Sequence, residues 1–114
     1  MSFGHSATTE QGVQILGLSG RIDSATAAQF EAAAAALCGG SGDRVVLDFA
    51  ALDYISSAGL RVVLQAAKRA KQNQARLLLC GMSANVREVF EISGFLKIID
   101  SVADRPSALQ LLAS

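Results

Sequence analysis

The stretch VVLDFAALDYISSAGLRVVLQAAKRAKQ, residues 45–72, decides the fold, because it joins a buried-strand pattern to an amphipathic-helix pattern. Residues 45–49 are almost continuously apolar, as expected of a strand covered on both faces of a sheet. After a short loop, a helix begins at Ser56-Ser57 and ends near Asn73, with apolar residues at the spacing of one helix face. These apolar positions are Leu60, Val63, Leu64 and Ala67. A buried strand followed directly by such a helix predicts an α/β protein.

Further strand patterns lie on both sides of this stretch. They cover residues 13–18, which end at a Ser19-Gly20 turn, residues 76–81, and a short edge strand at residues 95–99. Residues 3–8 can pair with residues 13–18 as an antiparallel hairpin around Glu10-Gln11-Gly12. The sheet is therefore expected to be mixed, with the remaining strands parallel.

Helix patterns alternate with these strands. The first begins at Asp23 or Ser24 and runs to about residue 37; another covers residues 85–92, between a Ser83 cap and Gly94; the last runs from Asp104 and Pro106 through residue 112. This alternation predicts right-handed crossovers and helices packed on the sheet. The length of 114 residues predicts a single domain over residues 1–114.

Charge and composition exclude several classes of function. Hydrophobic residues make up 51% of the chain and charged residues 18%, which is incompatible with an intrinsically disordered chain. Ten basic and ten acidic residues cancel, which removes the electrostatic drive for nonspecific nucleic-acid binding. Residues 54–87 nevertheless hold six basic residues and no acid: Arg61, Lys68, Arg69, Lys71, Arg76 and Arg87. Such a run is either a solvated helix face or a binding patch.

The residues that could support catalysis or bind metal are sparse. His5 is the sole histidine and is far in sequence from Cys38 and Cys80, so we expect neither a zinc site nor an enzyme nucleophile activated by histidine. The two cysteines are expected to be reduced core residues. The glycine-bearing loops lack the phosphate-loop pattern, and Asp23, Asp48 and Asp53 are interpreted as caps and turns. We predict no enzyme activity, no metal and no cofactor.

The N-terminus has no basic segment followed by an apolar run, and no stretch approaches about 18 uninterrupted apolar residues. These features predict a cytoplasmic protein without membrane insertion.

The start of the helix at residue 56 is the most informative site. A helix N-terminus presents unpaired amides and the positive end of the dipole, so a phosphate on a serine there is stabilised. Arg61 could assist Ser57 from one turn later. Alternatively, both serines are only helix caps. Gly59 is a poor helix residue in the first turn unless a partner chain or a neighbouring strand must approach closely.

Four segments together resemble a STAS domain of the stand-alone anti-sigma factor antagonist type. They are LSGRID (residues 18–23), VVLDF (45–49), ISSAGL (55–60) and FEISG (90–94). The resemblance implies a mixed, mostly parallel sheet of four to five strands with about four flanking helices. It also implies two protein partners: an anti-sigma factor that is a serine kinase of the histidine-kinase-like ATPase type, and a phosphatase of the PP2C type.

The resemblance also implies the site residues. The family's Asp-Ser-Ser/Thr-Gly-Leu pattern falls on Ser56-Ser57-Ala58-Gly59-Leu60, which makes Ser57 the phosphoacceptor. Ser56 replaces the usual Asp and Ala58 the usual Ser or Thr, so less charge and one hydroxyl fewer are presented to a kinase. The implied partner-binding residues are Gly20, Asp23, Ser56, Ser57, Ala58, Gly59 and Arg61.

Three functions are therefore considered. The first is a partner-switching antagonist that binds the anti-sigma factor kinase when unphosphorylated and is released when Ser57 is phosphorylated. The second is an unphosphorylated STAS scaffold subunit of an ABC-type membrane transport assembly. The third is a domain that senses a small ligand or nucleotide through an anion site at the helix N-terminus.

Overall fold

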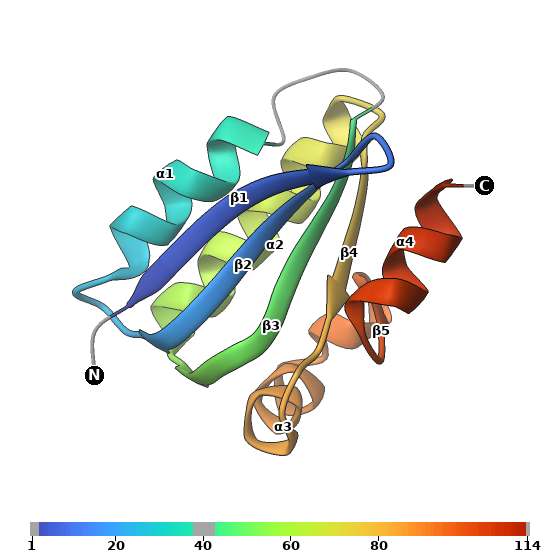
Figure 1. The fold of residues 1–114 in the computed structure, drawn as a ribbon. Helices are drawn as coiled ribbons and strands as arrows, with labels where there is room; N and C mark the ends of the chain where they lie inside the picture. The colour runs from blue at the N-terminus through green and yellow to red at the C-terminus, as the bar shows by residue number, and fades with distance from the viewer. Residues whose placement is uncertain (1–2, 38–42, 114) are drawn as a thin grey trace.

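The computed structural model describes residues 3–37 and 43–113. Five strands form one sheet in the order β1-β2-β3-β4-β5 (Figure 1). They are β1 (Gly4–Glu10), β2 (Val13–Ile22), β3 (Arg44–Ile55), β4 (Arg76–Cys80) and β5 (Asp100–Val102). β1 pairs antiparallel with β2, and the other neighbouring strands pair in parallel. The predicted hairpin and the mixed, mostly parallel sheet are confirmed.

Four α-helices and one short 3-10 helix are present in the described residues. They are α1 (Ala27–Leu37), α2 (Ser57–Gln72), α3 (Ala84–Ser93), η1 (Phe95–Lys97) and α4 (Arg105–Ala113). In Figure 1, α1 and α2 lie side by side on one face of the sheet and α4 lies on the other. Within residues 3–37 and 43–113, no helix has both the length and the apolar character needed to span a membrane.

The core is divided between the two faces of the sheet because β3 and β4 are apolar on both. Val45, Leu47 and Phe49 of β3 belong to the larger cluster, which includes the buried residues of α1, α2 and α3. Val46 of β3 belongs to the smaller cluster with Leu78, Cys80, Ala108, Leu109 and Leu112, beneath α4. The interpretation of residues 45–49 as a doubly covered central strand is confirmed.

The predicted helix boundaries hold at most ends. Ser56 is the N-cap of α2 and Asn73 its C-cap, and Ser83 caps α3, which stops at Gly94. The Asp104 carboxylate accepts a hydrogen bond from the Ser107 backbone N–H at 2.9 Å, so it caps α4 as expected. The first helix is shorter than predicted: residues 24–26 form a turn, and α1 begins at Ala27.

Three predicted strand limits are wrong. Ser19-Gly20 is not a turn that ends the strand predicted at residues 13–18, because both residues pair with β3 and β2 continues to Ile22. Residues 51–55 are not a loop, because β3 continues to Ile55 and pairs with the end of β2 through two register irregularities. Residues 95–99 are not the edge strand. There the chain forms η1 and then the edge strand at Asp100–Val102, because Phe95 and Leu96 pack against the larger core cluster.

The helix-face prediction for α2 is only partly right. Leu60 and Val63 are buried, but Leu64 and Ala67 are half-buried, and the helix also buries Val62, Ala66 and Ala70. The buried stripe is wide because α2 packs against both the sheet and α1.

Cys80 is confirmed as a free, buried thiol, and Cys38 lies outside the described residues. Burial, with a smaller contribution from the Asp48 charge, raises the pKa of the Cys80 thiol to about 12. Cys80 therefore stays protonated at neutral pH, which makes it a poor nucleophile.

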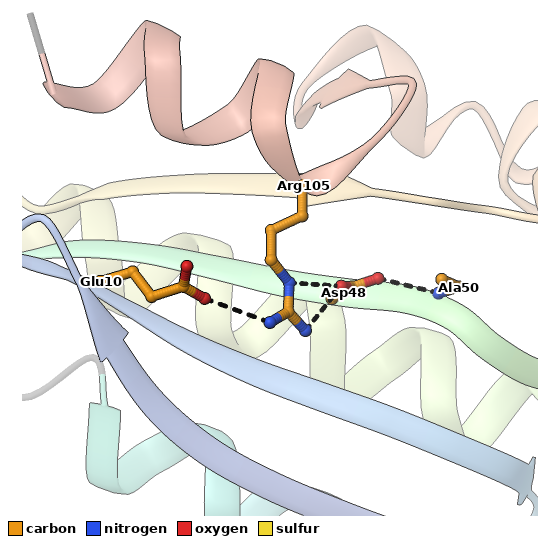
Figure 2. A network of polar contacts seen from close by, with 4 residues as sticks. All are labelled: Glu10, Asp48, Ala50 and Arg105. Carbon is orange, nitrogen blue, oxygen red and sulfur yellow. Dashed lines mark hydrogen bonds and ion pairs between the residues drawn. The ribbon is translucent and has the colours of Figure 1, made fainter.

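Asp48 has neither of the roles predicted for it, because it is a buried carboxylate inside β3, 7% exposed. Its Oδ2 lies 2.8 Å from both Nε and Nη2 of Arg105, and its Oδ1 accepts a hydrogen bond from the Ala50 N–H at 2.9 Å (Figure 2). Arg105 also donates from Nη1 to Glu10 Oε2 at 3.2 Å. One guanidinium thus links the start of α4 to β3 and to the end of β1.

We expect Arg105→Met to lower the free energy of unfolding by about 1–3 kcal/mol, because it leaves the Asp48 carboxylate buried without a cation. The cost is discounted from that of a fully buried pair because the Arg105 side chain is 37% exposed. Urea denaturation measures the change. Arg87→Met, which removes only the exposed pair with Glu91, should change stability by less than about 0.5 kcal/mol. Equal losses in the two variants would contradict the structural role of Arg105.

Candidate functional site

The N-terminus of α2 is held directly against the end of β2. The Ser56 N–H donates to the Ile22 carbonyl at 2.8 Å, and Ser56 Oγ accepts from the Gly59 N–H at 3.3 Å. Ile22 and Ile55, the last residues of β2 and β3, are partners in the parallel register. The cap and the strand ends therefore position the first turn of the helix without an intervening loop.

Ser57 is the first residue of α2, and its side chain is exposed. The first turn contains no acidic residue, so a negative group on Ser57 would face the free amides of the helix without a neighbouring carboxylate in that turn. Arg61 is exposed one turn later. In the part of the chain that the structure describes, no hydrogen bond or ion pair joins Arg61 to the unmodified Ser57, and the assistance of Arg61 to a phosphate on Ser57 stays a prediction.

Gly59 faces the protein's own strands. A Cβ built at this position would lie 2.7 Å from Ile22 Cγ2 and 2.7 Å from Ile55 Cγ1. Both atoms are attached to the Cβ of buried, β-branched side chains, so neither can move away easily. The sequence leaves two explanations for this glycine, the close approach of a partner chain or of a neighbouring strand. The structure shows the second, because Ile22 of β2 and Ile55 of β3 lie against Gly59.

Gly20 and Asp23 lie near the carboxyl end of β2, at the same edge of the sheet as the start of α2. Gly20 has φ +78 beside a register irregularity between β2 and β3, and it is buried. Asp23 Oδ1 accepts hydrogen bonds from the backbone N–H groups of Thr26 at 3.1 Å and Ala25 at 2.9 Å. The Thr26 bond is the main cause that lowers the pKa of Asp23 below its ordinary value of 3.8. This turn is thus most stable above that pH and weakens as the carboxylate is protonated in acid.

The structure adds a feature that the sequence analysis missed. The Arg21 guanidinium carbon lies 4.3 Å from the centre of the Tyr54 ring, a cation–π contact between the ends of β2 and β3. Arg21 and Tyr54 line a groove of about 330 Å³ together with Asp53, Ile55, Asn85, Val86 and Val89. Arg21 lies in the LSGRID segment, but only the strand register places it over Tyr54.

The residues predicted for the site come from two segments that meet at one edge of the sheet. The first segment is the start of α2, with Ser56 as its cap and Ser57, Ala58, Gly59 and Arg61 in the helix. The second is the end of β2, where Gly20 lies in the strand and Asp23 directly follows it. Gly20 and Gly59 are buried, whereas Ser57 and Arg61 are exposed. Within residues 3–37 and 43–113, no group of three or more His, Cys, Asp or Glu side chains could hold a metal ion.

The chain matches a known protein family over most of its length. The model of the STAS domain matches residues 5–108. The chain belongs to the STAS-domain family. The resemblance drawn from the four sequence segments is confirmed.

The relatives of this STAS domain carry consistent names. It is 53% identical over 97 residues to the Bordetella bronchiseptica protein named "Putative anti-sigma factor antagonist BtrV", covering 85% of this chain and 84% of the relative. It is 32% identical over 83 residues to the anti-sigma-B factor antagonist of Listeria monocytogenes, covering 73% of each chain.

Solved structures show the same fold. The crystal structure of an anti-sigma factor antagonist from Mycobacterium paratuberculosis superposes with a TM-score of 0.90 at 21% identity, covering 99% of this chain and 96% of that one.

We expect Gly59→Ala to lower the free energy of unfolding by about 1–2 kcal/mol. Overpacking against Ile22 and Ile55 costs more than the roughly 1 kcal/mol that alanine gains over glycine in helix propensity. Chemical denaturation of this variant beside Ser57→Ala, an exposed position in the same turn, measures the difference. A Gly59→Ala protein more stable than the wild type would show that the strands yield at this contact.

Proposed function

We propose that this STAS domain is an anti-sigma factor antagonist that works by partner switching, with Ser57 as the phosphoacceptor. The names of its relatives support the class of function. The observation that carries the proposal is the exposed Ser57 hydroxyl at the first position of α2, directly after a serine that is occupied as the helix cap. The chain then supplies a substrate hydroxyl to a kinase and performs no catalysis itself.

The proposed partner is an anti-sigma factor that is also a serine kinase of the histidine-kinase-like ATPase type. Ser57 Oγ attacks the γ-phosphorus of ATP, the new O–P bond forms as the bond to the β-phosphate breaks, and the hydroxyl proton is released. A PP2C-type phosphatase restores the serine by hydrolysis. One chemical group on one residue thus defines the two states.

The geometry favours Ser57 over Ser56 as the acceptor. Ser56 is half-buried and its Oγ already accepts the Gly59 N–H, whereas the Ser57 side chain is exposed. A phosphate on Ser57 brings about −1.5 to −2 charges to the positive end of the helix dipole. Phosphorylation therefore leaves the helix intact and changes the surface that a partner meets.

Loss of binding follows from desolvation. A partner that covers the first turn of α2 must remove water from this phosphate, and an unpaired buried charge costs several kcal/mol. Asp23 and Arg61 are proposed to contact the partner through their side chains. Ser56, Ala58 and the buried Gly20 and Gly59 would act by shaping the backbone at that surface.

Ser57→Asp is expected to weaken binding to the purified kinase of the source bacterium at least about tenfold, because it places a permanent charge in the interface. Ser57→Ala should bind like the unphosphorylated wild type and resist release by ATP. Isothermal titration calorimetry measures both affinities, and phosphopeptide mapping after incubation with ATP locates the modification.

Ser56→Ala tests whether the neighbouring serine is the acceptor instead, because it removes the Ser56 hydroxyl and leaves the Ser57 hydroxyl in place. It should still be phosphorylated at Ser57. Equal affinity of the wild type and Ser57→Asp, or modification at another residue, would disprove Ser57 as the switch. Stable binding of the unmodified chain to a membrane transport ATPase would instead favour the scaffold function.

A further inference from the structure

Basic residues continue from Ser57 along the exposed face of α2. Arg61 follows Ser57 by one turn, Lys68 follows Arg61 by two turns, and Lys71 is one turn beyond Lys68. Residues at these spacings lie on one helix face. Ser57, Arg61, Lys68 and Lys71 are all exposed, and we call them the α2 strip. At a rise of about 1.5 Å per residue, the strip is about 20 Å long.

No ion pair in the described part of the chain involves the α2 strip, although Lys71 lines a cleft that Asp100 also lines. Residues 54–87 contain no Asp or Glu. In the described part of the chain, the ion pairs are Arg87 with Glu91, and Arg105 with Glu10 and Asp48, so none involves α2. A solvated helix face of a neutral protein usually mixes both signs of charge, whereas this strip carries one.

Arg69 is exposed on α2 but lies on a different face of the helix from the α2 strip. It lines a small cleft between α1 and α2 with Glu31, Ala34 and Val62, on the side of α2 that faces α1. Arg69 and Lys71 both lie in the last turn of α2, where basic residues complement the helix dipole. Only Lys71 shares a face with Ser57, so dipole complementarity does not account for the alignment of the strip with the phosphoacceptor.

We infer that the α2 strip is a docking surface for an acidic face of the same anti-sigma factor kinase, an inference that rests on the proposed function. Two observations favour this occupant. The strip begins at the hydroxyl that the kinase must reach, so one partner can cover both. The chain has no net charge, which disfavours a nucleic acid as the occupant.

The strip also gives phosphorylation a second physical effect. Uniform positive charge speeds association with an acidic partner through electrostatic steering. A phosphate on Ser57 adds negative charge one turn from Arg61, at the end of the strip that meets the active site of the kinase. The modified serine thus reduces the attraction at the place where the proposed interface is tightest.

The test compares two double variants with the same change of charge. Lys68→Glu/Lys71→Glu reverses the strip at a distance from Ser57, and Arg69→Glu/Arg76→Glu reverses two exposed charges off the strip. Each pair includes one residue from the last turn of α2, so the effects on the helix dipole match. Stopped-flow association with the purified kinase is measured at about 0.05 and 0.5 M salt, with thermal unfolding as the folding control.

We expect the strip variant to associate at least tenfold more slowly than the wild type at low salt, with the difference largely lost at high salt. The off-strip variant should stay within about threefold of the wild type. Equal rates for the two variants, with normal binding by the wild type, would overturn the strip while leaving the proposed function intact.

Two other outcomes overturn the assignment of the partner. If the unmodified wild type does not bind the kinase at all, both the proposed function and the inference are wrong. If the strip variant binds the kinase normally but loses binding to duplex DNA or to phosphatidylglycerol vesicles, the strip serves a nucleic acid or a membrane surface instead.

Discussion

The parallel pairing of β2 with β3 is the constraint on which the position of Ser57, the proposed phosphoacceptor, depends. The strands end together at Ile22 and Ile55, and the backbone of Ser56 is bonded to Ile22 before the helix begins. Gly59 then allows α2 to start close to both isoleucines. The backbone of Ser57 is therefore positioned by the packed sheet and not by a loop.

The sequence predicts those parts of the fold in which one physical signal dominates. Residues 45–49 are recognisable because a doubly buried strand is apolar at nearly every position. The caps at Ser56 and Ser83 are recognisable because helix starts favour short hydroxyl side chains. Residues 51–55 give no such signal. Leu52 and Ile55 are buried but Ala51, Asp53 and Tyr54 are exposed, and register irregularities in the β2–β3 ladder remove the alternation typical of a strand.

The candidate site also contains residues that a local sequence pattern identifies and residues that only the fold brings together. Ser57 and its cap are local in sequence, so motif spacing finds them. The contact of Arg21 with Tyr54 depends on strand register, and the bond from Arg105 to Asp48 spans 57 residues, so no local pattern reveals either. The interpretation of Asp48 as a cap or turn residue is wrong because its partner is distant in sequence. The Arg105 guanidinium that stabilises this aspartate inside a strand reaches it only in the folded protein.

The two faces of the sheet use charge differently. On the α4 face, Arg105 is paired with two carboxylates of the same chain, buried Asp48 and exposed Glu10, so its charge contributes to stability. On α2, the charges of Arg61, Lys68 and Lys71 have no internal ion pair in the described residues and remain directed to solvent. Charge that is not paired inside the protein either keeps the helix face solvated or is available to a group outside the chain, as inferred for the α2 strip.

The number of charges and the screening length indicate how one phosphate on Ser57 could change binding at the α2 strip. The three basic residues of the strip carry about three positive charges, and a phosphoserine removes about 1.5 to 2 of them, so the sign of the strip is not reversed. Screening at physiological salt acts over about 8 Å, which leaves Lys71, about 20 Å along the helix, almost unaffected. In the proposed switch, release would therefore arise at the first turn of α2, where the partner would have to remove water from the phosphate, while the distal lysines would still steer the two proteins together.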